Sequence, residues 1–215
     1  MRTALVLGGL SGVGKTTVAT EILSNHPEFE LVRSATTRPR RNDGNEDEYI
    51  YLTREEFLDR VERGGMLEYT EFGGNLYGTP ASECGRIFDS GRLPLLVLDL
   101  NGLKSMARLD LGFRAAIIYI YEELSVVSAR LLAREKAAPS GKGMEAYERR
   151  MAMNRADYLC LPTLAPELSA FVRNTEVVSA AKECLAVYAH VARGGAPEVD
   201  KNIAIASVLA DSARR

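Results

Sequence analysis

The chain has 215 residues, which is enough for one α/β domain of ordinary size with inserted lobes. Hydrophobic residues make up 46% and charged residues 26%, and these proportions exclude an intrinsically disordered chain. The formal net charge of −2 excludes a broad basic surface of the kind that binds nucleic acid, so any anion site must be local.

Three short apolar runs predict buried strands, at 4–7, 95–98 and 116–120. None of them alternates between apolar and polar residues, so each should be buried on both faces, as in a parallel sheet. Helical patterns lie between the strands. They span 16–23, 124–136, 145–158 and 177–191. A further helix should begin at a capping box at 53–56 and end at Gly64. This alternation predicts an α/β fold with three layers, α/β/α, around a parallel central sheet.

Two stretches interrupt the alternation, and both could close over a ligand. Residues 34–83 are polar and rich in arginine and tyrosine, and they predict an inserted mixed α/β lobe with a hairpin whose second arm is 66–72. A loop at 139–143 separates two helices and predicts a lid over about 135–149. The core domain would then consist of 1–33 and 84–193.

The last stretch, 194–215, begins with Gly-Gly-Ala-Pro and predicts a linker that ends in a short apolar helix near 203–209. This helix could pack on its own domain or contact a partner. The sequence also leaves a homo-oligomer open.

Residues 9–16, Gly-Leu-Ser-Gly-Val-Gly-Lys-Thr, match the phosphate-loop pattern GxxxxGK[ST] between an apolar strand and a helix. Glycines let backbone N–H groups approach phosphate oxygens, and the N-terminus of the following helix also attracts an anion. Lys15 can bridge the β- and γ-phosphates, and the Thr16 hydroxyl can bind Mg²⁺. We therefore predict a P-loop fold whose ATP-binding residues are Gly9, Ser11, Gly12, Val13, Gly14, Lys15, Thr16 and Thr17.

Asp99 ends the apolar run at 95–98. A carboxylate at the carboxyl end of a central strand lies where a residue beside a nucleotide-bound magnesium ion would be. The same residue could instead cap the helix that follows it.

An arginine-rich cluster lies at 34–41, where three arginines and three hydroxyl side chains fall within eight residues. Pro39 resists helix formation, so these arginines should extend from a loop and could hold a phosphate dianion by bidentate contacts. Taken alone, the cluster could equally be a solvated basic loop. Tyr49, Glu68 and Tyr77 follow it and supply phenol donors and a carboxylate.

These blocks together resemble the guanylate kinase family. The resemblance covers about 2–191, and the blocks that carry it fall in the family's order at 9–17, 34–41, 48–49, 67–69, 74–79 and 98–99. It implies that Ser34, Arg38, Arg41, Tyr49 and Tyr77 hold the phosphate of GMP. It also implies that Glu68 and Thr79 bind the guanine edge, with Asp99 and Asn101 beside them.

The resemblance also implies catalytic roles for Lys15, Arg38, Arg134 and Arg150, which would neutralise charge on the transferring phosphoryl group. Arg134 and Arg150 could otherwise be solvated helix residues. The lid departs from the family pattern, because Glu135 replaces the usual glycine and the segment before Arg150 is about five residues longer. Asn174 would lie near the adenine.

The main departure is at Asn101, where the family usually has a second aspartate. An asparagine carbonyl can still accept a hydrogen bond from the guanine amino group, but without the assistance of a charge, which roughly doubles the strength of such a bond. This departure predicts either that the chain binds guanine more weakly than the family norm or that it uses a different acceptor.

The sequence thus predicts a cytoplasmic guanylate kinase that uses ATP and Mg²⁺ to phosphorylate GMP in line, without nucleic-acid or membrane partners. No run approaches the roughly 20 apolar residues that span a bilayer, and the three scattered cysteines suit a reducing compartment. His26 and His190 have no expected role. The alternatives are a P-loop kinase for another small phosphorylated acceptor and a non-catalytic guanylate-kinase-like interaction module.

Overall fold

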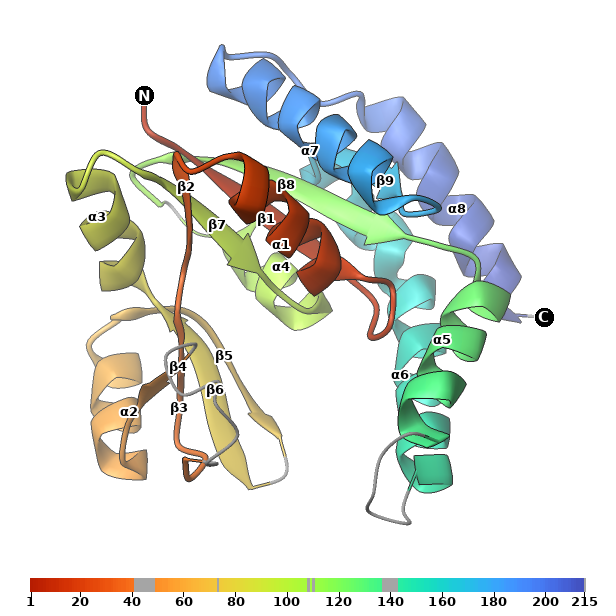
Figure 1. Ribbon diagram of the computed structural model, residues 1–215, viewed down its shortest axis with the longest axis horizontal. Coiled ribbons are helices and arrows are strands. Elements are labelled where there is room, and N and C mark those ends of the chain that lie inside the picture. Colours follow the sequence, from red (N-terminus) through yellow and green to blue (C-terminus); the bar gives the residue numbers. More distant parts are fainter. Residues whose placement is uncertain (41–48, 73, 108, 110, 137–142, 215) are drawn as a thin grey trace.

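The computed structural model describes residues 1–40, 49–72, 74–107, 109, 111–136 and 143–214 (Figure 1). Its main sheet is wholly parallel, with the strand order β2-β7-β1-β8-β9. The strands are β1 (Thr3–Gly9), β2 (Phe29–Leu31), β7 (Leu93–Val97), β8 (Arg114–Tyr121) and β9 (Ala170–Arg173). The three predicted strands are the three central ones, and their apolar side chains form the core of the protein. The two edge strands, β2 and β9, were not predicted.

Helices cover both faces of this sheet, which gives three layers. In Figure 1, α1 (Lys15–Asn25) and α7 (Val177–Ala192) lie in front of the sheet, while α4 (Leu100–Met106) and α6 (Gly143–Leu164) lie behind it. The packing of α4 is close, because a Cβ atom on Gly8 would overlap the side chain of Leu103. The helix α5 (Leu124–Lys136) follows β8 and runs beside α6.

The predicted lobe is a separate four-stranded sheet with the order β4-β3-β6-β5. Its elements are β3 (Ser34–Thr36), β4 (Tyr49–Tyr51), α2 (Arg54–Glu62), β5 (Met66–Phe72) and β6 (Asn75–Pro80). Strands β3 and β4 are parallel and the other pairs are antiparallel. The hairpin prediction was wrong in one respect: 66–72 is the first arm, and its partner is β6. The strand signal of β6 is weak because Gly78 and Pro80 interrupt it.

Helix α2 begins at the predicted capping box, in which Thr53 accepts from the backbone N–H of Glu56 and the Glu56 carboxylate accepts from that of Thr53. The helix buries Phe57 against Ala35 and Leu76 of the sheet, so the lobe has a small core of its own. Gly78 also faces α2, since a Cβ atom there would lie 3.1 Å from the ring of Phe57. One face of the lobe sheet is therefore covered by α2.

The lid region is only partly described. Helix α6 begins at Gly143, slightly earlier than the predicted 145–158, and continues to Leu164. Most of the predicted loop at 139–143 lies outside the described residues. In Figure 1 the lobe and the ends of α5 and α6 nearest this loop extend from the same side of the main sheet.

The C-terminal helix is longer than expected. Helix α8 (Val199–Arg214) replaces the predicted 203–209 and packs along α6 and the 3-10 turn η2 (Ala165–Glu167). Its buried residues are mostly alanines, which give a weak apolar periodicity, and Asn202 donates to the backbone oxygen of Leu168 at 2.8 Å. The helix thus packs on its own domain. Within the described residues, no helix is both long and apolar enough to cross a bilayer.

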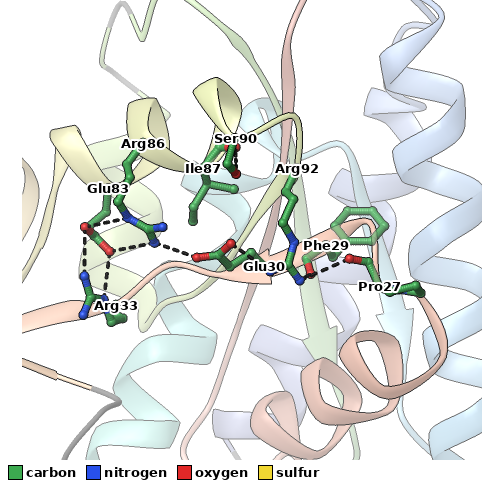
Figure 2. A network of polar contacts seen from close by, with 9 residues as sticks. All are labelled: Pro27, Phe29, Glu30, Arg33, Glu83, Arg86, Ile87, Ser90 and Arg92. Carbon is green, nitrogen blue, oxygen red and sulfur yellow. Dashed lines mark hydrogen bonds and ion pairs between the residues drawn. The ribbon is translucent and has the colours of Figure 1, made fainter.

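A chain of charged side chains ties the lobe to the main sheet (Figure 2). Glu83, on α3 (Ala81–Asp89), accepts from Arg33 at 3.1 Å and from Arg86 at 3.1 Å. Arg86 also donates to Glu30 at 2.7 Å, and Glu30 accepts from Arg92 at 2.9 Å. Arg33 immediately precedes β3, and α3 immediately follows β6. The Arg33–Glu83 pair therefore joins the two segments through which the chain enters and leaves the lobe.

Candidate active site

The phosphate loop connects β1 to α1 at the carboxyl edge of the sheet. Gly12 and Gly14 have φ values of +86° and +96°, a region that side chains other than glycine rarely adopt. A Cβ atom at Gly14 would also lie 2.4 Å from the side-chain nitrogen of Asn174. Both positions therefore require glycine, and the turn leaves backbone N–H groups at the start of α1 available to an anion.

Lys15 folds back over this loop. Its ammonium donates to the backbone oxygens of Gly9 and Leu10, at 2.7 and 2.9 Å. Burial lowers the pKa of Lys15 to about 8; Asp99 and Asp157 oppose this shift, and Arg134 adds to it. The lysine is thus a cation whose charge is held in a poorly hydrated position, where an anionic ligand would stabilise it.

A cavity of about 570 Å³ lies on one side of the loop. Arg130 contributes to its wall and donates to the backbone oxygens of Val13 and Asn174, at 3.3 and 3.2 Å. Asn174 donates to Val13 at 2.8 Å, and its own buried side-chain oxygen has no hydrogen-bond partner in the described structure. The predicted residues that line this cavity are Ser11, Gly12, Gly14, Lys15, Thr16, Thr17, Arg134 and Asn174. The side chain of Val13 is buried, and its backbone oxygen accepts the hydrogen bonds from Arg130 and Asn174.

A second cavity, of about 300 Å³, lies on the other side of the loop. Lys15 and Ser11 line both cavities, so the loop separates them. Asp99 is the N-cap of α4, where its carboxylate accepts from the backbone N–H of Gly102 at 2.8 Å. Asp99 therefore caps the helix that follows it, as one of its two interpretations predicted. The predicted residues that line this cavity are Gly9, Ser11, Lys15, Asp99, Asn101 and Arg150.

Asp157 is a residue of this cavity that the sequence analysis missed. Burial raises its pKa to about 6, and Asp99 adds to the shift, while Lys104 and Lys15 oppose it. Arg150 and Asp157 lie seven residues apart on α6, close to two turns, so they share one helix face. That spacing was a usable signal, but only once Arg150 was known to face the phosphate loop.

The predicted acceptor residues of the lobe share one face of its sheet. Ser34 lies opposite Tyr49, Thr36 opposite Tyr77, and Thr79 opposite Glu68. Side chains directly opposite one another, or two residues apart on one strand, point to the same face. Because Gly78 faces α2, this is the face that α2 leaves uncovered. The predicted residues on it are Ser34, Tyr49, Glu68, Tyr77 and Thr79.

Glu68 and Thr79 form a close pair on that face. The Thr79 hydroxyl donates to the Glu68 carboxylate at 2.7 Å. Burial raises the pKa of Glu68 to about 7, an effect that the bond from Thr79 opposes and the charge of Asp99 increases. Glu68 also lies close to α4, since a Cβ atom on Gly102 would be 3.4 Å from its side chain. Asp99 thus lines the second cavity together with Lys15, and the helix that it caps packs against Glu68 of the lobe.

The predicted arginines are distributed over three places. Arg38 lies 5.6 Å from the ring centre of Tyr49 and lines neither cavity. Arg134 lines the first cavity, and Arg150 donates to the Ser11 hydroxyl at 3.1 Å. Arg41 lies outside the described residues. Arg150 thus contacts the phosphate loop, Arg134 faces the cavity beside it, and Arg38 lies in the lobe.

Residues 1–160 match the family model described as guanylate kinase. The chain belongs to the guanylate kinase family. It is 38% identical over 187 residues to the guanylate kinase of Streptomyces kasugaensis, covering 85% of this chain and 84% of that one. It is 40% identical over 105 residues to the guanylate kinase of Prochlorococcus marinus, covering 48% of this chain and 57% of that relative's length.

Solved structures give the same result for the fold. The crystal structure of the guanylate kinase from Anaplasma phagocytophilum superimposes with a TM-score of 0.58 and covers 88% of this chain and 86% of that one. At 23% sequence identity, this likeness establishes the α/β fold alone. The family match and the fold therefore agree.

Proposed function

We propose that this chain transfers the γ-phosphate of ATP to GMP and releases ADP and GDP. The observation that carries the proposal is the position of Asp99, which lines the second cavity with Lys15 and caps α4, the helix that packs against Glu68 of the lobe. A nucleotide phosphate on the loop and a base held by the lobe would therefore both lie next to the start of α4. Direct transfer between two bound nucleotides requires this proximity.

The donor nucleotide would bind at the phosphate loop. Its phosphates would accept hydrogen bonds from the backbone N–H groups of the loop and of the first turn of α1. Lys15 would leave the oxygens of Gly9 and Leu10 and bridge the β- and γ-phosphates. The adenosine would occupy the first cavity, beside Asn174 and Arg134.

The family uses ATP, and nucleotide-bound Mg²⁺ fits the residues present. Mg²⁺ commonly keeps several waters and takes only one or two protein oxygens in addition to substrate phosphates. The hydroxyl of Thr16, an exposed residue at the start of α1, would supply one such oxygen, and Asp99 lines the cavity on the other side of the loop, which Lys15 also lines. When bound there, the ion would neutralise charge on the β- and γ-phosphate oxygens.

The acceptor would bind on the uncovered face of the lobe. Ser34, Arg38, Tyr49 and Tyr77, with Arg41 from outside the described residues, would hold its phosphate. Glu68 would accept from guanine N1–H and N2–H₂, and the Thr79 hydroxyl would turn from Glu68 to donate to O6. The carbonyl of Asn101 and the carboxylate of Asp99 would lie beside the amino group.

The chemical step needs no general base. An oxygen of the GMP phosphate, already ionised, forms a bond to the γ-phosphorus, while the bond from that phosphorus to the β–γ bridging oxygen breaks and its electron pair leaves with ADP. Arg134 and Arg150, together with Lys15, would stabilise the charge that spreads over the transferred group. Movement of the lobe, 34–83, and the lid, about 135–149, toward the core would exclude water.

The test is a coupled assay of the purified chain with ATP, Mg²⁺ and a panel of monophosphates: GMP, AMP, UMP and dTMP. We expect kcat/KM for GMP to exceed that for AMP by at least about 10³-fold. When adenine binds in place of guanine, the polar groups of Glu68 and Thr79 would be left without hydrogen-bond partners, which is costly. Equal turnover of GMP and AMP would refute the guanine assignment. No turnover of any monophosphate would favour a non-catalytic module.

A further inference from the structure

Helix α6 forms hydrogen bonds with the backbone N–H, the backbone oxygen and the hydroxyl of Ser11 in the phosphate loop. The side-chain oxygen of Asn154 accepts from the backbone N–H of Ser11 at 3.1 Å, and the side-chain nitrogen of Asn154 donates to the backbone oxygen of Ser11 at 2.9 Å. Arg150, one turn earlier on α6, donates to the Ser11 hydroxyl at 3.1 Å. One asparagine thus pairs with both main-chain groups of a single loop residue, as a neighbouring strand would.

This contact is partly buried, because Asn154 is buried while Ser11 lines both cavities. The side chain of Asn154 is almost wholly inaccessible, with 1% of the residue exposed. Replacing it would leave the two main-chain groups of Ser11 without their partner, and a buried polar group without a partner is costly. The cost would fall on a segment that contains three glycines with positive φ, Gly9, Gly12 and Gly14, and that therefore has the most conformational freedom to regain.

We propose that Asn154 is a positioning residue for the donor phosphates, an inference that rests on the proposed use of ATP by the phosphate loop. By fixing Ser11, Asn154 holds the turn in the conformation that directs the following N–H groups at the phosphates. Without that contact the loop would have to be ordered by the ligand, and the cost of ordering would appear as lost ATP affinity. GMP, bound by the lobe, would not share this cost.

Asn202 offers a matched control. It is also a buried helix asparagine, with 2% of the residue exposed, and it donates to a backbone oxygen, that of Leu168, at 2.8 Å. It lies on α8, which packs on α6 and η2, and the residue that it bonds, Leu168, lies outside the phosphate loop. A purely structural role for Asn154 would therefore make the Asn154 and Asn202 variants behave alike.

The experiment compares Asn154→Ala with Asn202→Ala. We measure the affinity for ATP by calorimetry without any acceptor, KM for ATP and for GMP, and the free energy of unfolding. The Asn154 variant should lose about tenfold in ATP affinity and raise KM for ATP by a similar factor, as expected for the loss of one to two partly buried hydrogen bonds. Its KM for GMP should stay within about twofold. The Asn202 variant should lose stability but keep both KM values.

Asn154→Asp covers the case in which the alanine variant does not fold. It keeps the acceptor for the Ser11 N–H, loses the donor, and places a negative charge beside the loop, so ATP affinity should again fall selectively. Unchanged ATP affinity, or an equal rise in both KM values, would overturn the inference for whichever variant folds. A wild-type chain that binds ATP but does not phosphorylate GMP would refute the proposed acceptor alone, because the ATP titration requires no acceptor.

Discussion

The hydroxyl of Thr79 donates a 2.7 Å hydrogen bond to the carboxylate of Glu68 across the β5–β6 hairpin. Without guanine, the two groups proposed to bind the base thus satisfy each other. Glu68 is nevertheless partly buried, and desolvation, with the charge of Asp99 adding to it, raises its pKa to about 7. The proposed guanine site therefore contains a carboxyl group whose pKa is raised toward neutral pH.

Binding of GMP should depend on pH through Glu68. The carboxylate can accept from guanine N1–H and N2–H₂, whereas the protonated acid loses part of this acceptor capacity. Because the pKa is raised, the carboxylate is lost as the pH falls through about 7, not through its usual range near 4.5. We expect KM for GMP to rise about tenfold between pH 8 and pH 6.

The control for this prediction is Glu68→Gln. The phosphate of GMP also titrates near pH 6, so part of any rise belongs to the substrate. The variant should bind GMP more weakly at pH 8. Its KM for GMP should change with pH only to the extent that the GMP phosphate itself titrates. Identical profiles for the wild-type chain and the variant would contradict the role of Glu68.

Removal of the Lys15 ammonium should abolish most of the activity. We expect Lys15→Ala to lower kcat by about 10³-fold, because a preorganised charge on the transferring phosphoryl group is lost. Lys182→Ala, an exposed lysine on α7, is the matched control and should keep normal kcat. Steady-state assays with saturating ATP and GMP provide the measurement, and ordinary turnover by the Lys15 variant would show that the phosphate loop is not the active site.

Asn101→Asp should strengthen GMP binding. Asn101 lies beside Asp99 at the start of α4, and its exposed side chain can reach a ligand in the second cavity. A carboxylate at this position would add charge assistance to the hydrogen bond from the guanine amino group, so the Kd for GMP should fall roughly three- to tenfold at pH 8. Calorimetry measures this directly. Unchanged or weaker binding would remove Asn101 as the explanation of any low guanine affinity.

The Arg33–Glu83 connection should affect both stability and the acceptor site. The side chain of Glu83 is only 8% exposed and is paired with two arginines, so Glu83→Gln should lower the free energy of unfolding by about 1–3 kcal/mol. It should also raise KM for GMP more than KM for ATP, since Arg33 directly precedes Ser34.

The exposed pair Arg2–Asp89 gives the comparison for this variant. Its side chains are 59% and 71% exposed, so Asp89→Asn should change stability by about 0.5 kcal/mol or less. Urea denaturation of both variants tests the difference. If the two variants were equally stable, the chain of charges in Figure 2 would have no special part in joining the lobe to the core.

Local patterns predicted the parts of the fold that depend on local sequence. The phosphate loop, the capping box at Thr53 and the three central strands are each encoded in a few consecutive residues. Strands β2 and β9 were missed because they are three and four residues long and lie at the sheet edges, where polar residues such as Glu30 and Arg173 are tolerated. The alanine-rich buried face of α8 gave too weak a periodicity to define its full length.

Local patterns alone predicted the candidate site only where one segment carries it, and the residues on separate segments were predicted through the resemblance to the family. Ser34, Tyr49, Glu68, Tyr77 and Thr79 share a face because of strand register, which the sequence did not reveal and the structure supplies. Asn154 and Asp157 were missed for a related reason. Their part in the site depends on how α6 packs against the phosphate loop, a contact between residues about 140 positions apart.

The central claim is that the donor and acceptor sites face each other across Asp99. Its most direct test is the affinity of one molecule that joins adenosine and guanosine through a chain of five phosphates, measured by calorimetry beside ATP and GMP alone. If the two sites lie at transfer distance, the joined ligand should bind at least about 10²-fold more tightly than either nucleotide, because the second contact becomes intramolecular. Binding no tighter than that of ATP alone would contradict the account.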